Sequence, residues 1–194
     1  MKTTVVPGLT ITGEMFEAAS AGVGNQVAEL APLTWERFIA PSGWTLVPDD
    51  RGDAYKAELV LRRTAESTVK INLWRLPDRR GSDQARPHDH PWHFRSHVLL
   101  GGYEEDRYVP QGGQVVPLLG VSHASGTVNE LPLAVYHEVT AVHEPDRTLT
   151  LMVCAAGATG QWGYLDTDTG EHVATSPDPD FASRLRALNP HKTY

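Results

Sequence analysis

The sequence lacks several features that define large classes of protein. It has one cysteine, Cys154, in 194 residues, which excludes an intrachain disulfide framework and a cysteine-rich zinc site. No apolar run approaches the roughly 20 residues that span a bilayer, and the first residues do not develop into the apolar core of a secretion signal. We therefore expect a cytoplasmic protein with no membrane partner.

Basic charge and the common catalytic motifs are also scarce. Lysine and arginine together number 17 against 24 acidic residues, so the net charge is −7, whereas a protein that binds nucleic acid normally carries a basic excess. The sequence contains no glycine-rich phosphate loop, no Gly-x-Ser-x-Gly turn and no dinucleotide-binding fingerprint. We therefore expect a small-molecule substrate as the partner, and no nucleic acid.

Short strand-like runs occupy the middle of the chain. They cover 56–63, 69–76, 94–100, 103–109, 115–121, 134–142, 148–154 and 161–166, with turn-forming residues between them. In the second run, Val69, Ile71 and Leu73 alternate with Lys70 and Asn72, which is the period of a strand with one buried face. Eight such runs predict an all-β sandwich or barrel over residues 56–166 rather than βαβ units.

The two ends of the chain break this pattern. Residues 1–55 are expected to form an irregular N-terminal arm with some helix, because glycine and proline interrupt the helix-forming stretches 12–19 and 27–30. In the tail, 167–194, Phe181, Leu185 and Leu188 lie at i, i+4 and i+7, which predicts a short helix over 181–188. We expect one domain, 1–194, whose arm covers a sheet edge or exchanges across a two-fold axis, making a homodimer.

Four of the nine histidines fall within ten residues, at positions 88, 90, 93 and 97. In an extended segment, His88 and His90 point to the same face with β-carbons about 7 Å apart, so both rings can bind one ion at about 2.1 Å. A later stretch, from Gly126 through Pro132 to His137, leads from a turn into a strand that carries a histidine. Such a strand could deliver a third imidazole to the same point.

These two segments resemble the signature motifs of the cupin superfamily. The first motif is matched by Gly81, His88, His90 and then Gly101 or Gly102, with a spacer one residue longer than usual. The second is matched at every anchor spacing by Gly126, Pro132 and His137, although Ala134 stands for a glycine and Ala141 for an asparagine.

The resemblance implies a fold and a metal site. The fold is a cupin-like jelly-roll β-barrel or sandwich, here with an irregular N-terminal arm and a short C-terminal helix. The site is one divalent ion held by His88, His90 and His137.

The glutamate of the usual cupin ligand set is missing, because its two expected positions hold Phe94 and Arg95. Two interpretations follow. In the favoured one, the three histidines alone bind the ion; in the other, a bulge at Pro91 turns His93 inward as a fourth ligand. The three-histidine set is similar to the iron site of cysteine dioxygenase and related cupin dioxygenases, and that similarity extends to the ligands only.

The resemblance favours an Fe(II) dioxygenase or oxygenase that acts on a small polar or anionic metabolite. Zn, Ni, Cu or Mn would also suit imidazole ligands, so the ligands do not select the metal. One alternative is a metal-assisted isomerase, epimerase or lyase, with His93 or Tyr136 as the base. Another is a non-catalytic module that binds a metabolite on the same barrel.

Several further side chains are candidates for contacts with the substrate. Trp92 and Phe94 share the inferred face of His88 and His90, so they form either the pocket wall or part of the core. A carboxylate clamp or a phenol donor near the substrate could come from Arg75, Tyr103, Tyr108 and Tyr136, each of which could also be structural. The remaining histidines, His97, His123, His143, His172 and His191, are expected on strands, turns or the surface, and Cys154 is expected to be a buried, inert thiol.

Overall fold

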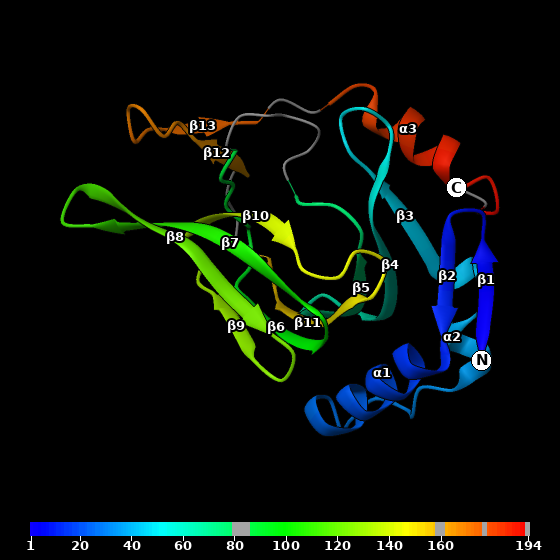
Figure 1. Cartoon of the computed structure of the whole chain (residues 1–194). Helices are drawn as coiled ribbons and strands as arrows, with labels where there is room; N and C mark the ends of the chain where they lie inside the picture. Colours follow the sequence, from blue (N-terminus) through cyan, green and yellow to red (C-terminus); the bar gives the residue numbers. More distant parts are fainter. Residues whose placement is uncertain (79–85, 158–161, 176–177, 193–194) are drawn as a thin grey trace.

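Two facing antiparallel sheets form the framework of the computed structural model, which describes residues 1–78, 86–157, 162–175 and 178–192 (Figure 1). The larger sheet has six strands in the order β3 (Trp44–Pro48), β4 (Ala54–Arg63), β5 (Ser67–Trp74), β11 (Thr148–Ala155), β6 (Phe94–Leu100) and β9 (Val128–Leu131). The smaller sheet has the order β10 (Tyr136–Val142), β7 (Gly102–Gln111) and β8 (Gln114–Ala124). Neighbours distant in sequence, such as β5 and β11, give the crossovers of a jelly roll, so the predicted fold class is confirmed.

Most of the predicted strands are present. The runs from 56–63 to 148–154 correspond to β4, β5, β6, β7, β8, β10 and β11. The last run, 161–166, begins outside the described residues and continues as β12 (Gly163–Leu165), which pairs with β13 (His172–Ala174). The short strands β3, β9 and β13 were not predicted, because a run of three to five residues carries little periodicity.

The six-stranded sheet has an apolar outer face and an inner face that mixes polar residues with apolar ones such as Trp74 and Val98. Ile71 and Leu73 of β5 and Leu151 of β11 are buried in a core that also includes residues of the N-terminal segment. The residues between them, such as Asn72 and Thr150, point to the opposite face, towards the smaller sheet. The alternation in the sequence therefore identified the buried face correctly, but that face packs against the N-terminal segment rather than filling the barrel.

The N-terminal segment is more ordered than the irregular arm predicted from the sequence. It forms β1 (Lys2–Val6), β2 (Leu9–Thr12), α1 (Gly13–Gln26), α2 (Trp35–Phe38) and a 3-10 turn, η1 (Pro41–Gly43). Thr12 caps α1 by accepting a hydrogen bond from the Met15 amide at 3.2 Å. Gly22 does not end this helix: a β-carbon there would lie 2.7 Å from Leu99 Cδ2, so the glycine permits close packing on β6.

The C-terminal helix forms where the sequence predicts it, as α3 (Phe181–Leu188), and lies beside β3 (Figure 1). The buried amide of Asn189 joins the two elements, since its Oδ1 accepts from the Leu46 amide at 2.7 Å and its Nδ2 donates to the Leu46 carbonyl at 2.8 Å. None of the helices in the described ranges has the length and apolar character needed to cross a membrane.

Two glycines of α1 should respond in opposite ways to a larger side chain. Gly22→Val should lower the free energy of unfolding by about 1–3 kcal/mol, because the new side chain overlaps Leu99. Gly24→Ala should raise it by about 0.4–1 kcal/mol, because no described atom lies within 4 Å of the new methyl and the unfolded chain loses freedom. Urea denaturation measures both; equal effects would show that α1 does not pack on β6 as described.

Candidate metal centre

A backbone bridge joins the two histidine-bearing segments. The His88 amide donates to the His137 carbonyl at 2.9 Å, and the His137 amide donates to the His88 carbonyl at 2.9 Å. The same stretch is held on its other edge by β12, where the Leu165 amide donates to the Pro87 carbonyl at 2.8 Å. Residues 87–89 therefore act as a short strand between β10 and β12, and directly opposed residues of such a pair present their side chains on one face.

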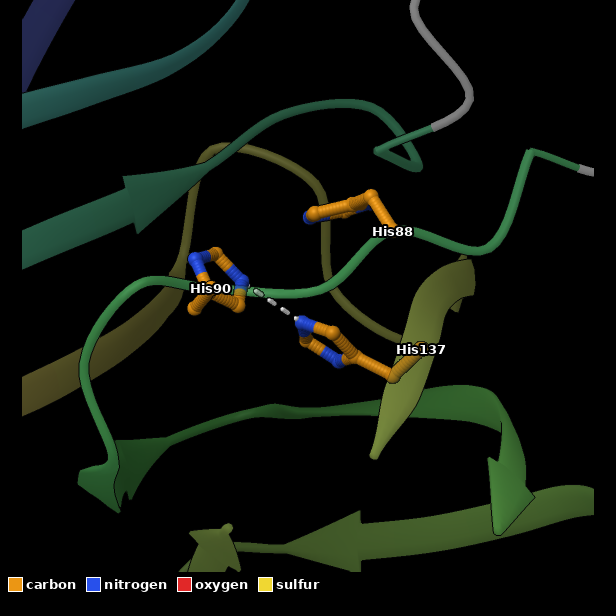
Figure 2. A group of neighbouring side chains, drawn as sticks. All are labelled: His88, His90 and His137. Atoms are coloured by element: carbon orange, nitrogen blue, oxygen red, sulfur yellow. Dashed lines mark hydrogen bonds between the residues drawn. The ribbon is translucent and has the colours of Figure 1, made fainter. Parts of the chain in front are cut away.

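The rings of His88, His90 and His137 converge as this pairing requires (Figure 2). One nitrogen of each ring lies within 4.8 Å of the others. The ring centroids are 4.9 Å apart for His88 and His90, 5.0 Å for His88 and His137, and 5.2 Å for His90 and His137. Among the residues that the structure describes, this is the one group of three such side chains placed to hold a metal ion.

Glu105 of β7 fixes the orientation of His137. Its Oε2 lies 2.9 Å from His137 Nδ1, so Nδ1 carries the proton and Nε2 faces the other two histidines. A carboxylate behind a ligating imidazole sets its tautomer and strengthens it as a ligand. Glu105 was not identified from the sequence. Its position in the strand predicted over 103–109 is the signal that could have indicated a side chain directed at the site.

Glu105 is itself the centre of a buried polar network. Its two oxygens contact His123 Nε2 at 3.0 Å and Asn129 Nδ2 at 3.0 Å, and Arg107 Nε donates to Oε1. Burial alone would raise the pKa of Glu105, but the hydrogen bonds from His123 and His137 hold it well below its usual range. His123 is thus a buried part of this network, and the prediction of a surface position for it is wrong.

The geometry of the His90 and His137 nitrogens fits a divalent first-row metal ion. His90 Nε2 and His137 Nε2 lie 3.0 Å apart. Two nitrogens about 2.1 Å from one ion and at right angles to each other have a separation of about 3 Å. Imidazole suits Fe, Zn, Ni and Cu alike, so this geometry favours metal binding without selecting the element.

The environment of His90 favours the neutral imidazole, which is the form that binds metal. Burial lowers the pKa of His90 well below its ordinary value, and the nearby rings of His137 and His88 lower it further. A protonated His90 is therefore disfavoured at neutral pH. His90 can therefore bind a metal ion without first losing a proton.

A small enclosed cavity of about 50 Å³ adjoins the triad between the two sheets. His90 and His137 line it from one side, and Phe94, Trp92 and Tyr103 contribute aromatic walls. The Phe94 ring lies 5.2 Å from the His90 ring and 5.8 Å from the His137 ring, so an aromatic side chain lies directly beside two of the three imidazoles. Trp92, Phe94 and Tyr103 therefore line the cavity beside the triad, and their contact with a substrate stays a prediction.

A second acidic residue near the triad was not anticipated. Asp78, which follows β5, is buried and lines the cavity. Its Oδ2 lies 3.9 Å from His88 Nε2. Its backbone amide donates to the Val139 carbonyl of β10 at 3.0 Å, which holds the loop after β5 against the strand that carries His137.

His93 and Tyr136 are not brought to the triad. His93 is exposed and lines a separate surface pocket with Arg95 and Glu130, so the bulge that would have turned it inward is absent. Tyr136 precedes His137 in β10 and therefore points to the opposite face, where its hydroxyl lies 3.0 Å from His172 Nδ1. Neither residue can serve as the base or fourth ligand proposed from the sequence.

Arg75 and Tyr108 also lie away from the cavity. Arg75 Nε donates to Asp146 Oδ1 at 2.7 Å, in the turn before β11. Tyr108 is directly opposite Tyr136 in the β10–β7 register and shares its outward face. Gly81 of the first motif lies outside the described residues.

A larger, open pocket of about 860 Å³ lies beyond His88. Trp162 and Tyr164 line it, and their rings lie 6.2 Å and 6.5 Å from the His88 ring. Arg86 and Arg184 also line it, where they pair with Asp50 and Asp178. The triad therefore lies next to two hollows of very different size.

Removing the charge of Glu105 should weaken metal binding. Glu105→Gln should reduce metal affinity by about 10- to 100-fold, because the carboxylate behind His137 is lost. Competition with a chelating dye measures the effect. Glu104→Gln is the matched control, since Glu104 is the adjacent strand residue and its side chain is half-exposed; equal losses in both variants would contradict the role of Glu105.

The stability of the metal-free protein should depend on pH through His90. Because its pKa is lower in the folded than in the unfolded state, the unfolded chain binds more protons as pH falls below about 6.5. The folded state should then lose up to about 1.4 kcal/mol per pH unit from this group. Urea denaturation at pH 7.5 and 5.5, with chelator, measures the free energy of unfolding. The decrease between the two pH values should be smaller in His90→Asn than in the original chain, and an equal decrease would contradict the assignment of this pH dependence to His90.

The similarity of this chain to known proteins is confined to solved structures. No protein-family model and no curated protein matches the sequence. Among solved structures, similar chains include KdgF from a Halomonas species (16% identity, TM-score 0.37, 54% of this chain and 82% of that one) and an RmlC-like cupin from Shewanella frigidimarina (13%, 0.34, 54% and 79%). A third is the polyketide cyclase RemF from Streptomyces resistomycificus (16%, 0.39, 75% and 91%).

The chain's own topology carries the fold assignment. Its two facing antiparallel sheets enclose a histidine triad, with two ligands from the segment before β6 and the third from β10. This chain therefore has a cupin-like jelly-roll fold.

Proposed function

We propose that the chain is a mononuclear metal-dependent enzyme, an Fe(II) oxygenase that acts on a small polar or anionic metabolite. The observation that carries the proposal is the convergence of three imidazoles on one point beside an enclosed cavity. Within the described residues, that group contains no carboxylate. Three neutral ligands leave the full charge of a divalent ion, which favours a negatively charged substrate.

Three protein ligands also leave room for reactants. A six-coordinate ion with three protein ligands on one face keeps open positions, as in the two-histidine, one-carboxylate sites of other oxygenases. A bound Fe(II) would supply the electrons for the activation of dioxygen and hold the substrate beside it.

The chain's own residues organise the site around that chemistry. Glu105 holds the proton on His137 Nδ1 and keeps Nε2 directed at the triad. The rings of Phe94 and Trp92 cover the triad on the cavity side and restrict water. Exclusion of water strengthens every charge interaction in the cavity and suppresses side reactions.

A metal-assisted isomerase or lyase is the second candidate, and the position of Asp78 favours it. A carboxylate 3.9 Å from His88 Nε2 and on the cavity wall is placed to remove a proton from a bound substrate. It would take the role that the sequence analysis gave to His93 or Tyr136. The two candidates differ in one respect, since only the oxygenase consumes dioxygen.

Metal content and oxygen uptake test the proposal together. Protein purified without chelators should contain about one iron per chain and consume dioxygen with a small carboxylic acid as substrate. His90→Ala should lose most of the metal and all of the uptake, whereas His93→Ala, the exposed neighbour, should keep both. Turnover of substrate without oxygen uptake would support the isomerase or lyase, and a full complement of metal in His90→Ala would contradict the site itself.

A further inference from the structure

The inner face of the six-stranded sheet carries a cluster of charge beside the triad. Lys56 and Glu58 are two positions apart on β4 and so share one face of it, and Lys70 lies on the neighbouring strand β5. Glu58 Oε1 accepts from Lys56 Nζ at 3.0 Å and from Lys70 Nζ at 2.8 Å. Both lysines line the cavity of about 50 Å³ that also contacts His90 and His137.

Lys56 is a fixed positive charge. Burial favours a neutral amine, but the negative charges of Glu58 and Asp78 outweigh it and raise the pKa of Lys56 above its ordinary range. Burial likewise opposes the charged form of Glu58, yet Lys56 and Lys70 lower its pKa to about 2. Lys56 is therefore not a base, and its ammonium group, which pairs with Glu58, is a hydrogen-bond donor at the cavity wall.

The charges around the cavity balance only while no metal ion is present. Two ammonium groups, Lys56 and Lys70, match two carboxylates, Glu58 and Asp78. A divalent ion on the triad therefore adds an uncompensated double positive charge, and the positive charge of Lys56 already acts on His90. An anion in the cavity would offset the charge of the ion and the charge of Lys56.

Two further groups define what the anion must carry. Trp92 Nε1 is a buried donor and Asn72 Oδ1 a buried acceptor, and neither has a hydrogen-bond partner among the described residues. Asn72 is only 1% exposed, and both residues line the cavity. Buried polar groups are nearly always paired, so these two indicate a ligand that both accepts and donates.

We propose that this cavity binds a small hydroxycarboxylate, whose carboxylate accepts from Trp92 Nε1 and Lys56 and whose hydroxyl donates to Asn72 Oδ1. The proposal deepens the proposed function and rests on it, because the bound metal ion supplies the positive charge that the carboxylate of the ligand neutralises. A hydroxyl suits the Asn72 acceptor better than an ammonium group, because the cavity already holds excess positive charge. The small volume restricts the ligand, or the end of it that enters, to a few non-hydrogen atoms.

Titration calorimetry with glycolate on the metal-loaded chain tests this. Glycolate should bind more tightly than acetate, which lacks the hydroxyl, and than ethylene glycol, which lacks the charge. Lys56→Met should weaken glycolate binding by about tenfold or more, whereas Lys2→Met, at an exposed lysine, should not change it. Equal binding of glycolate and acetate, or an unchanged affinity in Lys56→Met, would overturn the proposal.

A second variant covers the case in which Lys56→Met does not fold. Trp92→Phe keeps the aromatic wall but removes the indole N–H, and it should weaken glycolate by about three- to tenfold; no change would contradict the assigned contact. Metal content, measured on the same samples, distinguishes failure of the proposed function from failure of the proposed ligand. A chain that takes up no ion refutes the proposed function, whereas a chain with one ion that ignores glycolate refutes only this inference.

Discussion

The pair of backbone hydrogen bonds between His88 and His137 is the interaction on which the site depends. These residues are separated by the whole of β6 to β9, yet each amide donates to the other's carbonyl at 2.9 Å. Because directly opposed residues of an antiparallel pair share a face, this bridge alone sets two imidazoles side by side, and the two-residue period of the strand adds His90. The metal centre is thus a consequence of strand pairing, and no special loop conformation is required to assemble it.

The second constraint is the way the large sheet divides its two faces. Its apolar side chains, among them Ile71 and Leu151, are covered by β1, β2 and α1, which form one continuous core with them. The inner face is consequently free to carry Lys56, Lys70 and Asn72 beside the triad without supplying most of the hydrophobic stabilisation. The N-terminal segment, far from the chemistry, therefore allows the cavity to be polar.

Much of this arrangement could be predicted from the sequence, and the rest could not for definable reasons. Alternating apolar residues revealed the strands, and the spacing of His88, His90 and His137 indicated the triad. Periodicity does not reveal which partner covers a face, so the ordered N-terminal layer and the packing role of Gly22 were missed. Glu105 and Asp78 were missed because they reach the site from β7 and from the loop after β5, through register and loop path that the sequence does not encode locally. His93 as a fourth ligand, and His93 or Tyr136 as a base, were the alternatives drawn from the sequence, and both fail because these side chains lie away from the triad.

The most direct test of the account is a crystal structure with anomalous diffraction data collected at the absorption edge of the metal that copurifies with the chain. We expect one anomalous peak, which marks an ion about 2.1 Å from each of three atoms: Nε2 of His90, Nε2 of His137 and one ring nitrogen of His88. A peak elsewhere in the chain, or a triad whose third ring turns away from the ion, would contradict it.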